Sequence, residues 1–449
     1  MSGLRKLEKE YREIVEKDLQ AHAVCAEKIR DYIKNSTAQY HGRCVRTLYI
    51  PKLFTLDEVE LFEKLIKTLY GIFYKVIEHY RTDAEYRELF GFDRRLEKLI
   101  LREPAYDCPI PIARIDLFLN EETGDFHFCE FNTDGSSAMN EDRELNHAVA
   151  LTQAFQEFAD RHPVTTFELF DTWVTEFMNI YRTFQDCKEN PHVAVVDFME
   201  SATGEEFKIF VKAFEKQGIT AEICEIRDLR YRDGGLYSPS GNRIDAIYRR
   251  AVTSDIMKHY EEVSDLIRAV EEEKVCLIGD FCTQIVHNKV LYKILHDERT
   301  KAFLTEEENA YVKAHVPYTV SLTEGSFDYG EVLAHKDRWI IKPEDSYGSK
   351  GVHAGVECEE EEWKRFVDDC MGRGYILQQF CRPYVTDNID LVKDKEASFS
   401  GYSNLTGLFV YNGKFKGCYS RISESEIIST QYSEMALPTV IVQEKEGMA

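Results

Sequence analysis

Two neighbouring stretches decide the fold of this chain: Ile110-Pro-Ile-Ala-Arg-Ile-Asp-Leu-Phe-Leu119 and Phe126-His-Phe-Cys-Glu-Phe-Asn132. Both are rich in β-branched and aromatic residues and carry polar residues at alternate positions, which predicts two strands. The turn-prone segment 121–125 lies between them. We therefore expect an antiparallel hairpin whose polar side chains have a purpose beyond packing.

Four polar side chains share one face of this predicted hairpin. Because side chains alternate along a strand, Arg114 and Asp116 lie on one face of the first strand, as Glu130 and Asn132 do on the second. A turn over 121–125 places Asp116 opposite Glu130 and Arg114 opposite Asn132. Directly opposed carboxylates repel each other unless a cation lies between them, and such oxygen ligands suit Mg²⁺. The residues alone leave two interpretations open, a magnesium site and a surface charge cluster.

The composition excludes several classes of protein. The chain has 449 residues, 43% of them hydrophobic, so it has the material for large cores and is not wholly disordered. It carries 80 Asp and Glu against 56 Lys and Arg, a net charge of −24, which disfavours nucleic-acid binding. No run approaches the ~18 apolar residues of a membrane helix, and the 12 cysteines form no C-x-x-C pair. We expect a cytoplasmic enzyme with free thiols and no nucleic-acid or membrane partner.

Apolar periodicity and turn signals predict a mixed fold of class α/β, with α+β character. Thr55 with Glu58 is a typical helix cap, Gly218 stands where a helix ends, and Asn412-Gly413 marks a hairpin. These signals divide the chain into four regions: 1–104 (helical), 105–190 (the polar hairpin and helices), 191–282 (a β-α-β subdomain) and 283–449 (the remaining strands).

A second stretch whose residues could bind a ligand is Trp339-Ile-Ile-Lys-Pro-Glu-Asp-Ser-Tyr-Gly-Ser-Lys-Gly-Val352. An apolar strand ends at Lys342, and a loop rich in small residues follows. Glycines let a backbone approach a phosphate closely, and lysines neutralise its charge. The stretch contains neither a Walker A motif nor G-x-G-x-x-G. It predicts a phosphate-binding loop, with an ordinary turn as the alternative. The loop residues of interest are Ser346, Gly348, Ser349, Lys350 and Gly351.

Three further signals lie in the C-terminal region. Tyr375-Ile-Leu-Gln-Gln-Phe380 is a strand that ends before Cys381, where backbone groups could face an adenine edge; a plain core strand is the alternative. Lys289 opens a short helix that continues through Leu295. Arg421 stands at the exit of the last hairpin.

In this order the motifs resemble glutathionylspermidine synthase and, more broadly, the circularly permuted ATP-grasp carboxylate–amine ligases. The resemblance covers about 105–440 and rests on R-x-D, E-x-N, N-K, K-P-x-x-x-x-G-x-K-G-V, Q-Q-F and a late arginine. In ordinary ATP-grasp enzymes the E-x-N strand follows the phosphate loop, whereas here it precedes that loop. The resemblance implies a permuted ATP-grasp fold with an N-terminal helical region and a pre-ATP-grasp-like β-α-β subdomain.

The resemblance also implies an activity, the ATP- and Mg²⁺-dependent, ADP-forming ligation of a carboxylate to an amine through an acyl phosphate. The catalytic residues would be Arg114, beside the transferring phosphoryl group, and Arg421, near the reacting carboxylate. The implied magnesium ligands are Asp116, Glu130 and Asn132. The implied ATP contacts are Lys289, Lys342, Ser346, Gly348, Ser349, Lys350, Gly351, Gln378, Gln379 and Cys381. Ser349 departs from the pattern, since many relatives have glycine there.

The substrates are less determined by the sequence. Ser136 and Ser137 follow the metal strand and would contact the acid, or else cap a helix. Glu200 and Arg250 follow predicted strands of the β-α-β region, at the edge where open α/β sheets bind ligands. Glutathione with a polyamine is one pair that the resemblance suggests, beside amino acids and short peptides. A binding protein without ligase activity, a phosphotransferase and a homodimer formed by the N-terminal helices all stay open.

Overall fold

A central antiparallel sheet carries the polar hairpin. In the computed structural model, which describes residues 2–40, 42–346, 348, 350–429 and 434–443, its strands come from both halves of the chain. The order is β21-β20-β19-β4-β5, with β18 also paired to β19. The bounds are β4 (Ile112–Leu119), β5 (Phe126–Asn132), β18 (Val385–Asn388), β19 (Ser400–Tyr411), β20 (Lys414–Ser423) and β21 (Met435–Leu437). The Asn412-Gly413 turn between β19 and β20 has positive φ at both residues, as expected.

The hairpin has the predicted residue pairs, but its loop is longer than predicted and one strand contains a bulge. Asp116 lies opposite Glu130 and Arg114 opposite Asn132. The loop is one residue longer than predicted, because β4 already ends at Leu119, and the register then shifts between Asp116 and Leu117. Cys129 is the extra residue of this β-bulge, which offsets the longer loop.

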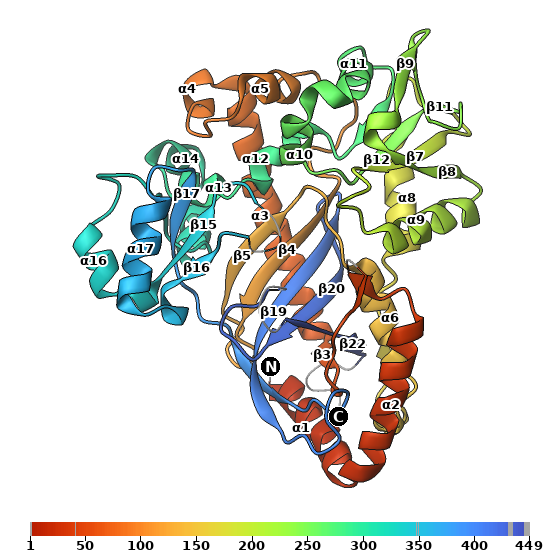
Figure 1. Ribbon diagram of the computed structural model, residues 1–449, viewed down its shortest axis with the longest axis vertical. Coiled ribbons are helices and arrows are strands. Elements are labelled where there is room, and N and C mark those ends of the chain that lie inside the picture. Colours follow the sequence, from red (N-terminus) through yellow and green to blue (C-terminus); the bar gives the residue numbers. More distant parts are fainter. Residues whose placement is uncertain (1, 41, 347, 349, 430–433, 444–449) are drawn as a thin grey trace.

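A parallel sheet forms the second layer and contains the predicted β-α-β unit. Its order is β13-β12-β7-β8, with all neighbours parallel. Gly218 adopts φ +79° after the connecting helix α9 (Gly204–Lys216), as its predicted place at a helix end requires. The strands are β7 (His192–Asp197), β8 (Thr220–Glu225), β12 (Ala246–Arg249) and β13 (Cys276–Ile278). In Figure 1 this sheet lies at the upper right.

A third sheet carries the predicted phosphate loop. Its order is β14-β17-β15-β16, and all its pairs are antiparallel. The strands are β14 (Thr319–Ser321), β15 (Trp339–Pro343), β16 (His353–Ala354) and β17 (Tyr375–Gln379). Two helices, α16 (Tyr329–Ala334) and α17 (Glu360–Cys370), accompany it as a lobe at the left of Figure 1. The fully buried Trp363 joins them by donating from its indole N–H to the carbonyl of Val332 at 3.1 Å.

The N-terminal region is mainly helical, and one of the strands it contributes, which the sequence did not predict, pairs with the C-terminal part of the chain. Its helices are α1 (Ser2–Glu16), α2 (Leu19–Asn35), α3 (Leu56–Thr82), α4 (Ala84–Arg87) and α5 (Arg94–Ile100), and Thr55 with Glu58 forms the expected capping box at α3. Strand β3 (Lys52–Thr55) pairs with β22 (Thr439–Val442), which also pairs with β6 (Val164–Thr165). Helix α3 packs on the central sheet, where the Phe73 and Phe131 rings lie 5.0 Å apart. Residues 1–104 therefore share a core with the central sheet.

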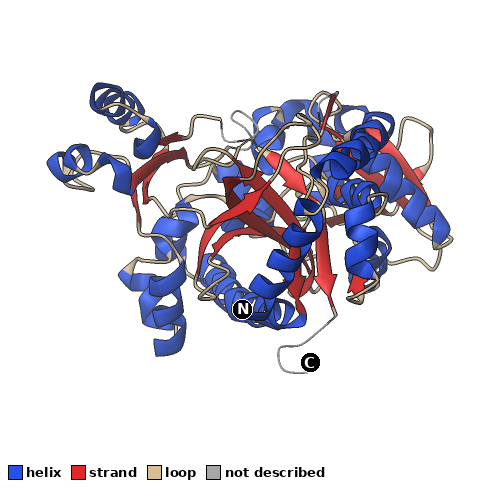
Figure 2. Ribbon diagram, turned by 90° about the horizontal axis from the view of Figure 1, so that it is seen from below, coloured by secondary structure: helices blue, strands red, loops and turns tan. Residues whose placement is uncertain are grey.

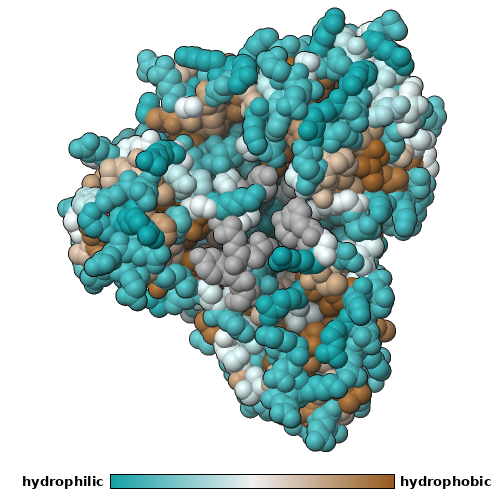
Figure 3. Space-filling model, viewed as in Figure 1, coloured by the Kyte–Doolittle hydropathy of each residue, from teal (hydrophilic) through white to brown (hydrophobic). Residues whose placement is uncertain are grey.

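The remaining elements connect and cover these sheets, and Figure 2 shows helices flanking the central strands. The helices are α6 (Met139–Val149), α7 (Gln153–Ala159), α8 (Phe170–Tyr181), α10 (Thr253–Lys258), α11 (Ser264–Glu271), α12 (Gln284–His287), α13 (Val290–Ile294), α14 (Glu298–Phe303) and α15 (Glu306–His315). The short strands are β1 (Gln39–Tyr40), β2 (Arg43–Cys44), β9 (Arg230–Arg232), β10 (Gly235–Tyr237) and β11 (Arg243–Ile244). Hydrophilic residues dominate the face in Figure 3. Across the described ranges, no helix has the length and apolar character needed to span a membrane.

Candidate active site

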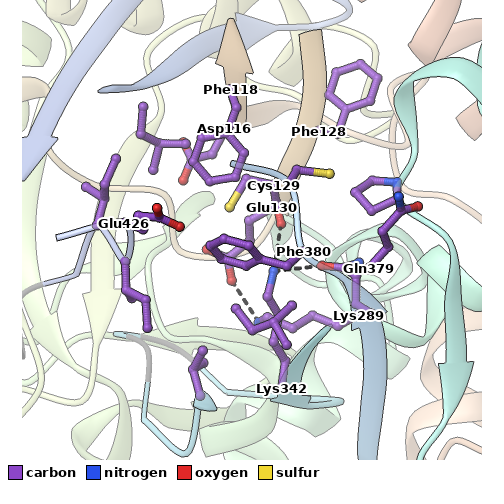
Figure 4. Close-up of a pocket in the computed structure, with 18 of the residues that line it drawn as sticks. Asp116, Phe118, Phe128, Cys129, Glu130, Lys289, Lys342, Gln379, Phe380 and Glu426 are labelled. Atoms are coloured by element: carbon purple, nitrogen blue, oxygen red, sulfur yellow. Dashed lines mark hydrogen bonds and ion pairs between the residues drawn. The ribbon is translucent and has the colours of Figure 1, made fainter. Parts of the chain in front are cut away.

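A cavity lies between the central sheet and the sheet of the phosphate loop. It encloses about 840 Å³ of empty space, part of it open to solvent. Figure 4 shows side chains from both sheets converging there. Of the residues singled out in the sequence, the cavity is lined by Asp116, Glu130, Lys289, Lys342, Ser346, Lys350, Gln378, Gln379, Cys381 and Arg421. These residues come from segments up to about three hundred positions apart, so the fold brings the separate motifs together.

Asp116 is the electrostatic centre of one end of the cavity. Its side chain is fully buried and accepts hydrogen bonds from Arg114 at 2.8 and 3.1 Å, from Asn132 Nδ2 at 3.1 Å and from Arg421 Nη2. Burial acts to lower the pKa of both arginines, but Asp116 outweighs it and raises them, so both stay charged. The opposed carboxylate of Glu130 does not share these donors.

Backbone groups fix Arg114 from two sides. Its Nη1 donates to the carbonyl oxygen of Ser137 at 3.0 Å. On the neighbouring strand β19, Gly407 lies directly against the pair: a Cβ there would come within 2.8 Å of Asp116 Oδ1 and 2.9 Å of Arg114 Cδ. The absence of a side chain at Gly407 therefore provides the space in which the two charged groups meet.

Glu130 forms the second charged pair of the site. Its Oε1 lies 2.7 Å from Lys289 Nζ, which also donates to the carbonyl of Ser346 at 2.8 Å. Burial disfavours the ionised form of Glu130, but Lys289, together with Lys342 and His287, outweighs this effect and lowers its pKa to about 2. Glu130 is therefore a carboxylate at neutral pH, and Lys289 links it to the predicted phosphate loop.

A chain of hydrogen bonds fixes Lys342. Its Nζ donates to Gln378 Oε1 at 2.8 Å, while Gln378 Nε2 donates to the hydroxyl of Thr319 at 3.0 Å. That hydroxyl in turn donates to the carbonyl of Pro317 at 2.9 Å. Because a hydroxyl has one proton, the bond to Pro317 forces Thr319 to accept from the amide and so orients the Gln378 oxygen toward Lys342. Gln378 is thus engaged with Lys342 rather than free on the cavity wall.

The predicted phosphate loop reaches the cavity through two of its described residues. Ser346 and Lys350 line the cavity, whereas Gly348 and Gly351 stand beside it with φ +64° and +74°. A Cβ at Gly351 would come within 3.1 Å of the Tyr375 hydroxyl, so glycine suits both the conformation and the packing there. Ser349 lies outside the described residues.

The cavity also has an apolar lining, to which the residues at the end of β17 contribute. Gln379 and Cys381 follow each other along this wall on either side of Phe380, and burial raises the pKa of the Cys381 thiol to about 12. The aliphatic and aromatic lining comprises Phe118, Phe128, Ile340, Val352, Phe380, Leu405, Ile427 and Ile428. The site therefore combines charged and apolar side chains, a lining that suits a ligand with anionic and aromatic parts.

Comparison with known proteins identifies similar folds but no similar sequence: neither a protein-family profile nor a curated protein matches. A glutathione synthetase-like effector of Globodera pallida superposes with a TM-score of 0.60, at 10% identity over 93% of this chain and 96% of that one. The two chains share a fold. That fold is a mixed α/β architecture with several sheets.

Two other solved structures have TM-scores below 0.5 and carry no weight. A protein assigned as gamma-glutamylcysteine synthetase from Methylobacillus flagellatus gives 0.42, at 12% identity over 84% of this chain and 86% of that one. D-cycloserine synthetase gives 0.27, at 17% identity over 57% of this chain and 92% of that one. The shared fold thus rests on the first comparison.

The residues predicted to contact the substrates lie outside the cavity. Ser136 and Arg250 are buried, and Arg250 pairs with Glu206 at 3.0 Å and donates to the Ser136 carbonyl. Glu200 is exposed and pairs with Arg227. These contacts engage both charged candidates within the protein itself.

The alternative helix-cap role for the two serines is wrong. The N-cap position of α6 is Ala138, and no side chain at that position caps the helix. Instead Glu206 accepts from the backbone N–H groups of Ala138 and Asn140 at 3.1 and 3.2 Å. Ser136 and Ser137 contribute through their carbonyls, which accept from Arg250 and Arg114.

The donor set fits a magnesium ion in part. Two carboxylates and an amide oxygen are ligands that Mg²⁺ accepts, and Glu130 is ionised and faces the cavity. Asp116 is already satisfied by two arginines and Asn132, so it would join a metal only by exchanging one of those hydrogen bonds. Within the described residues, no three His, Cys, Asp or Glu side chains form a ready metal cluster.

Three residues of the site had no signal in the sequence motifs. Gly407 sits inside an apolar strand, Thr319 is a buried hydroxyl in a short strand, and Glu426 follows β20 without a recognisable pattern. Only the glycine offered a hint, since glycine in a strand interior often marks a close approach of other groups.

Proposed function

We propose that the protein is an ATP- and Mg²⁺-dependent, ADP-forming carboxylate–amine ligase. The observation that supports this most is the convergence in one cavity of two lysines from separate segments with an arginine-rich carboxylate centre. Lys289 and Lys342 come from different elements and both line the cavity, beside Asp116, Glu130 and Arg421. A triphosphate is a ligand that suits two lysines and an arginine that line one cleft with apolar side chains nearby.

In this proposal the nucleotide lies along the cavity. The lysines, with Ser346 and Lys350 on the same wall, would hold the phosphates, and the apolar lining near Cys381 would hold the base. Gln378 would act through Lys342, since its amide oxygen accepts from that lysine. The loop would exclude water, which protects a hydrolysable intermediate.

The chemistry is the transfer of the terminal phosphoryl group to a carboxylate. A carboxylate oxygen attacks the terminal phosphorus, the bond to ADP breaks, and an acyl phosphate forms. Arg114 and Arg421 would stabilise the charge on the transferring group. The amine then attacks the acyl carbon, and inorganic phosphate leaves with the formation of the amide. A Mg²⁺ ion held by Glu130 and Asn132, with Asp116, would neutralise phosphate charge during transfer.

We further propose that the enzyme is glutathionylspermidine synthase-like and circularly permuted. The order of motifs supports this, since the E-x-N strand precedes the phosphate loop in the chain. In the central sheet, β4 nevertheless pairs with β19, which follows that loop in the chain. The acid and amine would be small molecules such as peptides or polyamines. Ser136, Ser137, Glu200 and Arg250 stay proposals for substrate contact. Arg250 pairs with Glu206 and Glu200 pairs with Arg227, so either charged residue would have to leave its partner to contact a substrate.

The test is Mg²⁺-dependent ADP release across a panel of carboxylates, with hydroxylamine as the amine. We expect one acid to stimulate release and to yield its hydroxamate, because hydroxylamine captures acyl phosphates. ATP binding without release under any acid of the panel would instead support the second candidate. ATP hydrolysis without hydroxamate formation would indicate phosphotransfer to another acceptor.

The second candidate is a nucleotide-binding protein without ligase activity. It is favoured by the saturation of Asp116, whose oxygens accept from Arg114, Arg421 and Asn132. If this arrangement persists with nucleotide bound, Asp116 is unable to hold a metal ion. Titration with Mn²⁺ followed by electron paramagnetic resonance would separate the two candidates, since the ligase requires a nucleotide-dependent metal site that the binding protein lacks.

A further inference from the structure

The segment from α12 to α13 bridges the two sheets that enclose the cavity. Helix α12 packs against β5 of the central sheet, and α13 packs against β14 of the sheet that carries the predicted phosphate loop (Figure 1). The two helices have four and five residues, so the chain passes from one sheet to the other within a short span. A side chain on this segment can therefore act on groups of both sheets.

Three hydrogen bonds join this segment to the start of the phosphate loop. The backbone N–H of Lys289 donates to the carbonyl of Glu344 at 2.9 Å, and its Nζ donates to the carbonyl of Ser346 at 2.8 Å. At the residue between these two, Gln284 Nε2 donates to Asp345 Oδ2 at 2.6 Å. Of the three bonds, the one from Gln284 joins two side chains, so a substitution can remove it without changing the backbone.

The side chain of Gln284 is buried for the sake of this one bond. It is 1% exposed, and its Oε1 has no hydrogen-bond partner among the described residues. Because a carboxylate only accepts hydrogen bonds, the amide nitrogen has to face Asp345. Burying an amide that satisfies only one of its two groups is less favourable than burying an apolar side chain. The bond to Asp345 therefore has a use beyond packing.

That use follows from the position of Lys289 beside the loop. An ammonium group has three donors. One of them meets Glu130 Oε1 at 2.7 Å and another meets the carbonyl of Ser346, so the direction of the third depends on where that carbonyl lies (Figure 4). Asp345 precedes Ser346 in the chain, and its bond to Gln284 limits how far the carbonyl can move. Lys289 itself lines the cavity.

We propose that Gln284 is a positioning residue for phosphate binding. By holding Asp345 it keeps the Ser346 carbonyl on Lys289, and it thereby aims the third donor of this lysine into the cavity. The proposal rests on the proposed function, because it takes the anion in the cavity to be the phosphates of a nucleotide. Gln284 would act without touching the ligand, since it lies outside the cavity lining.

The test compares the dissociation constants of ATP and adenosine for the full chain by calorimetry with Mg²⁺. Gln284→Met removes the amide at nearly constant shape, and Asp345→Ala removes the acceptor from the exposed partner. Each variant should bind ATP about fivefold more weakly, the usual effect of losing an ordinary hydrogen bond. Adenosine carries no phosphate, so its affinity should match that of the native protein. Asp345→Ala also serves if the methionine variant does not fold.

Three further variants isolate the bond from other effects. The double variant Gln284→Met with Asp345→Ala should also lose about fivefold, because one bond can be lost only once. Asp345→Asn keeps an acceptor oxygen and should retain most of the native ATP affinity. Glu344→Ala removes a neighbouring carboxylate but keeps the backbone carbonyl, so it should not weaken ATP, since a lost negative charge favours anion binding.

Hydrogen exchange of the chain without nucleotide provides a second readout. In Gln284→Met and in Asp345→Ala one bond fewer holds the loop start. The backbone N–H of Lys289, which donates to Glu344, should therefore exchange faster in both variants. The peptide over helix α9, in the parallel-sheet region, should exchange at the native rate and serves as the internal reference.

Other outcomes would overturn the inference in distinguishable ways. Native ATP affinity in both single variants, or losses that multiply in the double variant, refute the role of Gln284 while the proposed function stands. Tighter ATP binding in Asp345→Ala, as in Glu344→Ala, would show that only charge matters there. An equal loss for adenosine would indicate a general disturbance of the cavity, which also refutes the role. Failure of the native protein to bind ATP refutes both this inference and the proposed function.

Discussion

Replacing Thr319 with valine tests the hydrogen-bond chain that fixes Lys342. Thr319 is 1% exposed, and its hydroxyl donates to the Pro317 carbonyl and accepts from the Gln378 amide. Valine has nearly the same shape but no hydroxyl. Thr319→Val therefore leaves the amide and the carbonyl unpaired, and it frees the Gln378 amide to turn away from Lys342.

Two effects of different size follow from this geometry. A buried polar group left unpaired costs about 1–3 kcal/mol, and the variant creates two of them, so the free energy of unfolding should fall by about 2 kcal/mol or more. The bond that holds Lys342 in position is worth about 1 kcal/mol, and this energy corresponds to about fivefold in an equilibrium constant. We therefore expect the dissociation constant of ATP to rise about fivefold.

The assay is calorimetric titration with ATP, together with urea unfolding of each variant. Thr319→Ser is the matched control, because it keeps the hydroxyl and loses only a methyl group, so its ATP affinity should stay near that of the native protein. Equal ATP affinity in the serine and valine variants would refute the reasoning, since the hydroxyl would then have no influence on Lys342.

Three further predictions concern the rest of the site. Glu130→Gln should lower acid-stimulated ADP release by about 100-fold, because the variant removes the carboxylate that pairs with Lys289 and would hold the metal ion. Its circular dichroism spectrum should stay native. Unchanged release would show that Glu130 holds neither a metal ion nor the lysine that contacts phosphate. Gly407→Ala should lower kcat/KM by about 10- to 100-fold, since its Cβ would lie 2.8 Å from Asp116 Oδ1 and would displace that carboxylate. Native kinetics in this variant would mean that the position of Asp116 does not limit the reaction. Asp197 has its pKa raised by burial to about 7, against the opposing effect of Arg250. Its folded form therefore keeps a proton that the unfolded chain releases, so this group weakens the fold as pH rises from about 4 to 7, and Asp197→Asn should show a flatter dependence of urea-unfolding stability on pH; parallel curves for the two proteins would contradict this.

Local patterns were sufficient where a structure depends on neighbouring residues. The capping box at Thr55 and the turn at Asn412-Gly413 formed as predicted, because each is closed by residues within a few positions. The pairing of Asp116 with Glu130 was also predicted correctly. In each case the sequence contains both partners of the interaction within a short span.

Contacts between distant segments could not be predicted in the same way. Nothing near Thr319 indicates that its hydroxyl orients Gln378, because these residues meet only when β14 pairs with β17. The same holds for Gly407 and the arginine centre, and for β3, whose partner β22 lies almost four hundred residues away. The motifs located the charged groups, whereas the residues that position them depend on sheet order.

The pairing of Asp116 with Arg421 shows how far charge alone can be used for prediction. The resemblance implied that the oxygens of Asp116 face a metal ion together with Glu130, but Arg421 reaches Asp116 from β20 and donates to one of these oxygens. The sequence placed Arg421 at a strand end without indicating which carboxylate it would meet. Charge complementarity predicts that such groups pair, and only the fold determines the partner.

The β-bulge at Cys129 has a consequence for how this strand is compared with those of other proteins. Strict alternation would put Phe126, Phe128 and Glu130 on one side, yet the Phe128 ring contacts that of Phe131 at 5.4 Å because the extra residue reverses the sides partway along. A sequence alignment without a gap at this point would misalign either Phe126 and Phe128 or Glu130, by one position, with a relative whose strand is regular. A relative one residue shorter at this point would keep Glu130 on the same side and would differ only in the local bend. Absence of a counterpart to Cys129 is therefore compatible with an intact site, because Asp116 would still lie opposite Glu130.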